Sequence, residues 1–159
     1  MITKADKKDF DFIYELYMHP QINPYLLYEP MDVTAFLPIF EELINKQVLF
    51  VYEDETKKIG MCKLVPQQHR NAHILYLGGV GIVVSQSGKG YGLNMLKEIK
   101  EYARINNFLR IELSVATLNE RAIQLYEKAG FVKEGILKKF TYLKKEDKYL
   151  DEVLMACLL

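Results

Sequence analysis

The chain has 159 residues, of which 50% are hydrophobic and 26% charged, a composition typical of one globular domain and not of a disordered or fibrous protein. Its 21 basic residues balance 21 acidic ones, which argues against a protein that binds nucleic acid or an anionic membrane through its overall charge. No apolar stretch approaches the roughly 20 residues that span a bilayer, and the opening residues lack the apolar core of a signal peptide. We therefore expect a cytoplasmic protein.

The first part of the chain predicts two helices and a hairpin. Apolar residues recur at helical spacing in residues 7–19 and again in residues 32–46. The segment between these helices holds three prolines, which predicts an irregular loop. Residues 47–65 alternate in a way that indicates two strands around a polar turn.

A third long strand is predicted over residues 73–84. Gly78, Gly79 and Gly81 lie inside it, and glycine weakens a strand interior. Such glycines are expected where a β-bulge or a closely approaching backbone requires them. Without such a feature, this would be a core strand weakened by its glycines.

The second half alternates helix and strand. A helix opens at a glycine-rich loop and runs to about Asn106, and a strand follows over residues 109–117. Asn119 is the expected N-cap of a short second helix, and Gly130 is its expected C-terminal stop. The remaining residues predict two strands around a charged turn. Without repeats or a linker, these elements predict a single α/β domain over residues 1–159, with helices on both faces of a mixed sheet.

Neither cysteines nor histidines indicate a metal site. Cys62 and Cys157 lie in apolar runs without a metal-ligand spacing, so we expect two small core residues rather than a disulfide. His69 and His73 have no third ligand at a suitable spacing.

The loop "SQSGKGYGLNML", residues 85–96, places three glycines at alternating positions before a helix. Backbone N–H groups of such a loop, together with the helix N-terminus, form a site suited to a pyrophosphate. The triphosphatase loop GxxxxGK[ST] does not fit this spacing, and the dinucleotide fingerprint GxGxxG fits it poorly. A dinucleotide site and a plain chain reversal stay open as alternatives.

The residues after the loop support a further interpretation. The segments "SGKGYGLNMLKEIKEYA" and "IELSVATLNERAIQLYEKAGF" closely resemble the acetyl-CoA signature of the GNAT N-acetyltransferase superfamily. That signature has an R/Q-x-x-G-x-G/A loop, then a helix and a strand, then N-x-x-A-x-x-x-Y-x-x-x-G-F. The matching positions in its second half are Asn119, Ala122, Tyr126, Gly130 and Phe131. One position departs from the signature, because Ser87 stands where the family usually has Arg or Gln.

The resemblance implies a GNAT-like fold, which is a mostly antiparallel sheet with a splayed central strand pair, and acetyl-CoA as the cosubstrate. It implies that backbone groups of the strand before the loop pair with the pantetheine arm of CoA, and that the loop holds the pyrophosphate. The residues expected at CoA are Val80, Gly81, Ile82, Ser87, Gly88, Lys89, Gly90, Tyr91, Gly92, Asn119 and Tyr126.

Acetyl transfer to an amine needs a proton for the departing thiolate and a group that takes the proton of the amine. A free thiol has a pKa of about 8.5, so a nearby tyrosine with a pKa of about 10 can protonate the thiolate. The resemblance gives this role to Tyr126, which could otherwise be a plain core residue of its helix. Glu112, a carboxylate on a strand near the centre of the sheet, is our candidate base.

The acceptor is less well specified. By resemblance its pocket is built from the variable segments of the family, and Tyr25, Tyr28, Tyr142 and Tyr149 could form an aromatic lining. We expect the primary amine of a small molecule or an amino acid, acetylated directly in a ternary complex. A protein N-terminus, as in acetyltransferases of ribosomal proteins, is the alternative. A CoA- or dinucleotide-binding module without turnover is a further alternative, and the choice between a monomer and a homodimer stays open.

Overall fold

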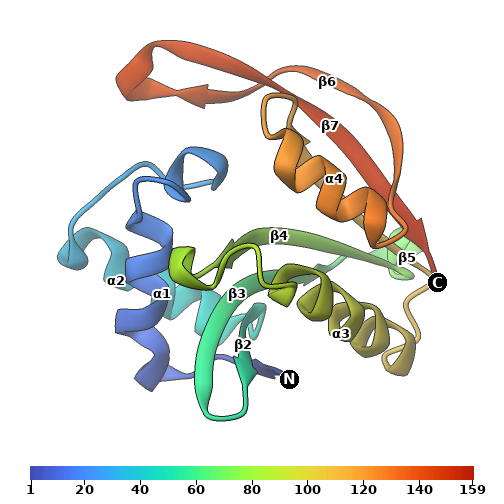
Figure 1. The fold of residues 1–159 in the computed structure, drawn as a ribbon, viewed down its shortest axis with the longest axis horizontal. Helices are drawn as coiled ribbons and strands as arrows, with labels where there is room; N and C mark the ends of the chain where they lie inside the picture. Colours follow the sequence, from blue (N-terminus) through green and yellow to red (C-terminus); the bar gives the residue numbers. More distant parts are fainter.

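A computed structural model describes residues 1–159, and Figure 1 shows helices arranged around a single sheet. The sheet has seven strands in the order β1-β2-β3-β4-β5-β7-β6, and only the β4–β5 pair is parallel. The strands are β1 (Ile2–Lys4), β2 (Leu49–Asp54), β3 (Lys57–Pro66), β4 (Ile74–Ile82), β5 (Arg110–Ala116), β6 (Val132–Leu143) and β7 (Lys148–Leu158). The helices are α1 (Phe10–Met18), α2 (Val33–Asn45), α3 (Tyr91–Ile105) and α4 (Glu120–Lys128).

The sheet separates two hydrophobic cores because successive strand residues point to opposite faces. On β2, Phe50 and Tyr52 belong to a core with residues of α3 and α4, whereas Leu49 and Val51 belong to a core with residues of α1 and α2. Both faces of the sheet are therefore covered by a pair of helices, as the sequence predicts.

The predicted elements are all present, and local signals fix their ends. The side chain of Asn119 accepts a hydrogen bond from the backbone N–H of Ala122 at 3.2 Å and caps α4. Gly130 follows this helix with a φ of +92°, a conformation that favours glycine. The short strand β1 was not predicted from the sequence. None of the helices combines the length and the apolar character needed to cross a bilayer.

A β-bulge explains one of the three glycines of β4, Gly79. Gly79 and Val80 together face a single residue of β3, Cys62, because the register shifts at this point. Gly79 has a φ of +57°, and a Cβ atom there would lie 2.8 Å from the hydroxyl oxygen of Tyr17. Glycine is thus required both by the backbone conformation and by the closeness of α1. Of the two reasons expected for glycines in this strand, a β-bulge or a closely approaching backbone, the structure shows the bulge.

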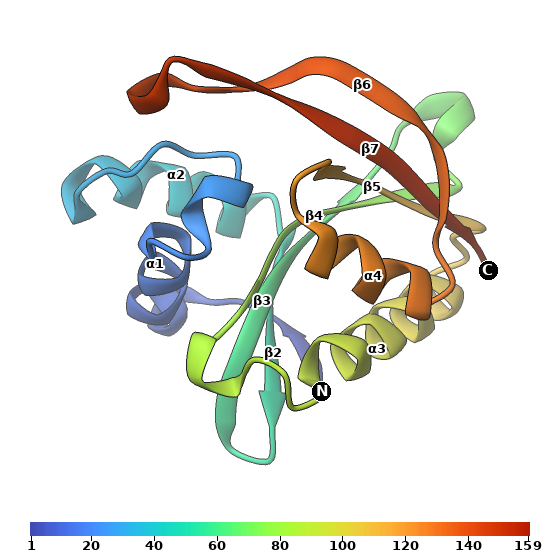
Figure 2. The same ribbon diagram turned by 45° about the horizontal axis from the view of Figure 1, so that its top comes forward.

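The parallel strands β4 and β5 separate soon after they pair. Their register covers Ile74–Tyr76 against Arg110–Glu112, although both strands continue beyond these residues. The hairpin of β6 and β7 arches over the molecule, as Figure 2 shows. Near its tip, the backbone N–H of Lys144 donates a hydrogen bond to a carboxylate oxygen of Glu29 at 2.9 Å. The splayed pair expected from the resemblance is therefore present, and a hairpin crosses above the segment between α1 and α2.

Candidate active site

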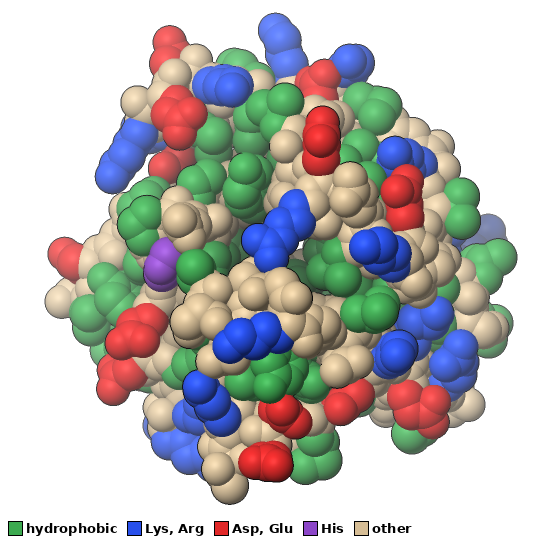
Figure 3. Space-filling view, viewed as in Figure 1, with side chains coloured by type: hydrophobic (Ala, Val, Ile, Leu, Met, Phe, Trp, Pro, Cys, Tyr) green, Lys and Arg blue, Asp and Glu red, His purple; other side chains and the backbone are tan.

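A cavity of about 720 Å³ opens where β4 and β5 part. Figure 3 shows a hollow across the middle of this face with a basic side chain lying over it. Residues of β4 and β5, the glycine loop and α4 line the cavity, with Gln21, Ile22 and Tyr25 at its other side. Its size is typical of sites that enclose a cosubstrate or a drug-sized ligand. Among the residues predicted for CoA, those that line it are Val80, Gly81, Ile82, Ser87, Gly88, Gly90, Gly92, Asn119 and Tyr126.

The glycine loop presents the N-terminus of α3 to this cavity. Gly88 and Gly90 have φ values of +81° and +87°, and Gly90 is the N-cap of α3 without a capping side chain. The backbone N–H groups of the first turn of α3 are therefore free of side-chain partners and available to an anion, whose charge the helix dipole favours. This arrangement suits a pyrophosphate.

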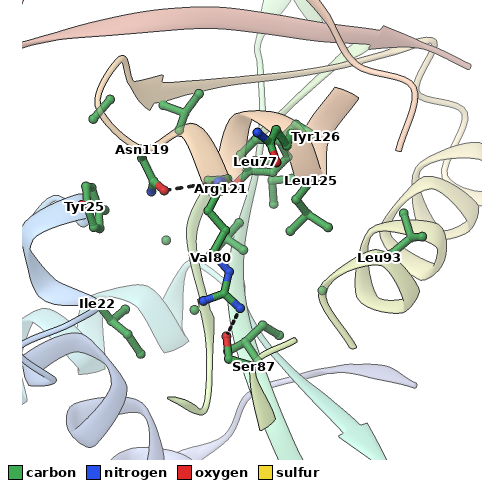
Figure 4. A pocket seen from close by; sticks show the side chains of 18 of the residues that line it. Ile22, Tyr25, Leu77, Val80, Ser87, Leu93, Asn119, Arg121, Leu125 and Tyr126 are labelled. Atoms are coloured by element: carbon green, nitrogen blue, oxygen red, sulfur yellow. Dashed lines mark hydrogen bonds between the residues drawn. The ribbon is translucent and has the colours of Figure 1, made fainter. Parts of the chain in front are cut away.

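Arg121 of α4 reaches the same loop. Its guanidinium donates a hydrogen bond to the hydroxyl oxygen of Ser87 at 2.7 Å, and Figure 4 shows the side chain extending across the cavity to this contact. Arg121 was not among the residues predicted at CoA, although it lies between Asn119 and Ala122 of the family signature. Arg121 thus brings a guanidinium to the loop position at which Ser87 replaces the usual Arg or Gln.

Two loop residues predicted at CoA do not line the cavity. The ammonium of Lys89 donates a hydrogen bond to the side chain of Gln86 at 3.1 Å. The ring of Tyr91 lies 6.4 Å from the ring of Tyr52, centroid to centroid. The side chain of Lys89 is thus bonded within the loop, and the ring of Tyr91 packs toward β2.

Tyr126 brings an ionisable hydroxyl to the cavity from the inner side of α4. Its side chain is 7% exposed, and its ring packs edge-on against Phe131 with centroids 5.8 Å apart. Burial raises the pKa of Tyr126 above the ordinary value for tyrosine, because a phenolate loses solvation there. The group is therefore kept protonated, as a proton donor must be.

Glu112 lies outside the cavity. It is paired with Tyr76 at the last residue pair before β4 and β5 part, whereas the cavity begins beyond that point. Its carboxylate accepts a hydrogen bond from the guanidinium of Arg110 at 3.1 Å. The structure does not bring Glu112 together with Tyr126 in the cavity, because the side chain lies at the closed end of the splayed pair.

A different carboxylate lines the cavity. Glu152 of β7 is paired with Ala116 of β5, so both side chains point to the same face of the sheet. Its carboxylate accepts a hydrogen bond from the hydroxyl of Thr141 at 2.6 Å, and it is the one acidic side chain in the lining. Only the β5–β7 register places it there, so the sequence analysis missed it.

Of the four tyrosines predicted around the acceptor, Tyr25 lines the cavity. Tyr28 packs against Tyr17 with ring centroids 5.4 Å apart, and Tyr142 stacks on Tyr149 at 4.7 Å in the β6–β7 hairpin. These three tyrosines do not line the cavity. No group of three or more His, Cys, Asp or Glu side chains is placed to hold a metal ion.

The site geometry agrees with the result of a sequence comparison. The model of the acetyltransferase (GNAT) family matches residues 10–131, a range that contains the splayed strands, the glycine loop and α4. The chain belongs to the GNAT acetyltransferase family. It is an acetyl-CoA-dependent N-acetyltransferase, and the fold expected from the resemblance is confirmed.

Curated relatives within the GNAT family act on different amines. The spermidine N(1)-acetyltransferase of Vibrio cholerae is 33% identical over 146 residues, which cover 86% of this chain and 80% of that protein. The L-amino acid N-acetyltransferase AaaT of Escherichia coli is 27% identical over 164 residues, covering 98% of this chain and 96% of that protein. Similarity to GNAT enzymes therefore extends over almost the whole chain.

A solved GNAT structure shows the same fold. The crystal structure of spermidine N-acetyltransferase from Vibrio cholerae in complex with CoA and spermine superimposes with a TM-score of 0.86 at 24% identity. The match covers 99% of this chain and 94% of that chain.

Proposed function

We propose that this GNAT enzyme transfers the acetyl group of acetyl-CoA directly to the primary amine of a small molecule within a ternary complex. One observation carries the proposal: a single cavity joins an anion-binding loop at the N-terminus of α3 to a buried tyrosine and a carboxylate on the far strands. Donor and acceptor can thus lie in one enclosed space, and no covalent intermediate on the protein is needed.

The donor half of the cavity binds CoA through backbone and guanidinium groups. N–H groups at Gly88, Gly90 and the first turn of α3 receive the pyrophosphate, and Arg121 adds a charge-assisted contact in place of a side chain at Ser87. The bulged backbone around Val80 faces the space between the splayed strands and offers polar groups to the pantetheine arm.

In the chemical step Tyr126 is the proton donor and Glu152 is the proton acceptor. The amine nitrogen attacks the thioester carbon, the C–N bond forms, and the C–S bond breaks. Tyr126 donates its proton to the sulfur of the departing thiolate. Glu152, rather than Glu112, attracts the amine and receives its proton directly or through water, because Glu152 lines the cavity and Glu112 does not.

A small acceptor is favoured over a polypeptide. The β6–β7 hairpin crosses above the segment that carries Tyr25 and is held there by the hydrogen bond between Lys144 and Glu29. Polyamines are our first choice of acceptor, since Glu152 is the one acidic side chain in the lining and the relatives that act on spermidine cover most of this chain. Amino acids are the second choice, because one relative acetylates them.

A panel of acceptors tests the proposal. Thiol release from acetyl-CoA is followed with spermidine, several L-amino acids and a peptide with an N-terminal alanine, and each product is identified by mass spectrometry. We expect thiol release that depends on a small amine and a product that carries one acetyl group. Turnover of the peptide alone would overturn the acceptor class, and thiol release with neither spermidine nor any of the amino acids would contradict both choices of acceptor.

A further inference from the structure

The β6–β7 hairpin, which arches over the molecule in Figure 2, contains a bulge next to Glu152. Leu137 of β6 faces Glu152, whereas Thr141 faces Leu150. Four steps along β6 therefore match two steps along β7, so β6 holds two extra residues at this point. Glu152 and Leu150 are two residues apart and point to the same face of the sheet. Their partners on β6 point to that face as well.

The bulge decides which side chain of β6 reaches Glu152. The hydroxyl of Thr141 donates a hydrogen bond to Oε1 of Glu152 at 2.6 Å. If β6 paired regularly beyond Leu137, Thr141 would face Lys148 instead. That position lies four residues, or roughly 13 Å, from Glu152 along β7. The contact between the hydroxyl and the carboxylate thus depends on the two extra residues.

Asp151, the neighbour of Glu152 in the chain, holds the bulge in place. Its carboxylate accepts hydrogen bonds from the backbone N–H of Lys139 and from the ammonium of Lys138, both at 2.8 Å. Its backbone carbonyl accepts a third hydrogen bond, from the N–H of Thr117 at 3.0 Å, in the segment that leads from β5 to α4. Lys139 has a φ of +48°, which is unfavourable for a residue other than glycine. Such a conformation persists where the surrounding contacts fix it, and Asp151 supplies them.

The contact with Thr141 leaves one oxygen of Glu152 to the cavity. An ionised carboxylate only accepts hydrogen bonds, so the hydroxyl is the donor and Oε1 is occupied. The other oxygen, Oε2, is bonded to no side chain of the protein. Threonine is β-branched and has few side-chain rotamers, so Thr141 is a stiff support for the carboxylate.

We propose that Thr141 is a positioning residue for acetyl transfer, whose hydroxyl fixes the carboxylate of Glu152 so that Oε2 faces the amine. The inference rests on the proposed function, in which Glu152 attracts the amine and receives its proton. An N–H bond of the attacking amine breaks and an O–H bond forms at Oε2, directly or through water. The hydroxyl of Thr141 keeps its own proton and its hydrogen bond to Oε1. Thr141 therefore acts through Glu152 and does not touch the reacting atoms.

Thr141→Val removes the hydroxyl and keeps the branched shape of the side chain. We expect kcat/KM for the best small amine to fall about tenfold, because the carboxylate loses its orientation. Acetyl-CoA affinity should stay within about twofold, which also reports that the variant is folded. Thr141→Ser keeps the hydroxyl and should stay within about threefold of the wild-type kcat/KM. Thr34→Val, at an exposed threonine of α2, is the matched control and should leave kcat/KM unchanged.

A double-mutant cycle with Glu152→Ala distinguishes positioning from a general effect on the hairpin. If Thr141 acts through Glu152, Thr141→Val should change kcat/KM by less than about twofold once the carboxylate is gone. Equal losses with and without Glu152, or wild-type activity of Thr141→Val, would overturn the positioning role. The proposed function would still stand in both cases if Glu152→Ala alone lost activity. Full activity of Glu152→Ala would instead contradict the role of Glu152 in the proposed function, and the positioning role with it.

Discussion

The guanidinium of Arg121 and the hydroxyl of Ser87 lie 2.7 Å apart, and this hydrogen bond connects α4 to the glycine loop. GNAT enzymes usually carry Arg or Gln at the loop position that Ser87 occupies. The structure places a guanidinium at the same loop from a different element. We infer that Arg121 compensates for the missing Arg or Gln side chain at position 87.

Arg121→Ala is therefore expected to weaken acetyl-CoA binding by about 1.5–3 kcal/mol, the scale of a hydrogen bond to a charged group. Ser87→Ala should cost less than about 1 kcal/mol, since it removes one neutral partner. Calorimetry with CoA on both variants provides the measurement. A larger loss for Ser87→Ala than for Arg121→Ala would show that the serine, and not the arginine, binds the phosphate.

Gly90→Asp is expected to weaken CoA binding further, on the order of 2–4 kcal/mol, because it brings a negative charge to the pyrophosphate site. A Cβ atom at Gly90 meets nothing within 4 Å, so the variant should fold. Gly90→Asn has the same shape without the charge and tolerates the positive φ about as well. If Asn and Asp weakened binding equally, backbone conformation rather than charge would be responsible.

Gly79→Ala is predicted to destabilise the fold by about 1–3 kcal/mol, because the residue has a φ of +57° and its new methyl group would lie against the hydroxyl of Tyr17. That hydroxyl is buried without a hydrogen-bond partner. Tyr17→Phe should therefore be neutral or stabilising, and in the double variant it should recover part of the loss. Urea unfolding of the three variants checks this, and purely additive effects would contradict the proposed clash.

Glu152→Gln is expected to lower kcat/KM for the amine by about 10-fold to 100-fold, while acetyl-CoA affinity stays within about twofold. The control is Glu112→Gln, which alters a carboxylate of β5 that lies outside the cavity and accepts a hydrogen bond from Arg110. We expect the control to keep its activity. The reverse result, with loss only in Glu112→Gln, would return the role of base to Glu112.

Local sequence signals predicted most of the fold because they act over a few residues. The cap at Asn119, the stop at Gly130 and the glycine loop each depend on neighbours in the chain. The bulge at Gly79 was predictable as a feature of its strand, but its register against Cys62 was not.

The missed parts of the site depend on contacts between distant segments. Glu152 reaches the cavity only through its pairing with Ala116, and a shift of one residue in that register would turn it to the other face. Arg121 reaches Ser87 only because α4 packs beside the loop. The strand β1 spans three residues, too few for an alternating pattern to indicate it.

The most direct test of the proposed chemistry is Tyr126→Phe, assayed for thiol release with the best small amine and for CoA affinity. The substitution removes only the hydroxyl and keeps the ring that packs on Phe131, so thermal stability should hold. We predict a kcat lower by about 10²-fold to 10⁴-fold, the usual loss of a general acid, with CoA affinity nearly unchanged. A kcat within about threefold of the wild-type value, with chemistry shown to be rate-limiting, would contradict the role of Tyr126 as the proton donor.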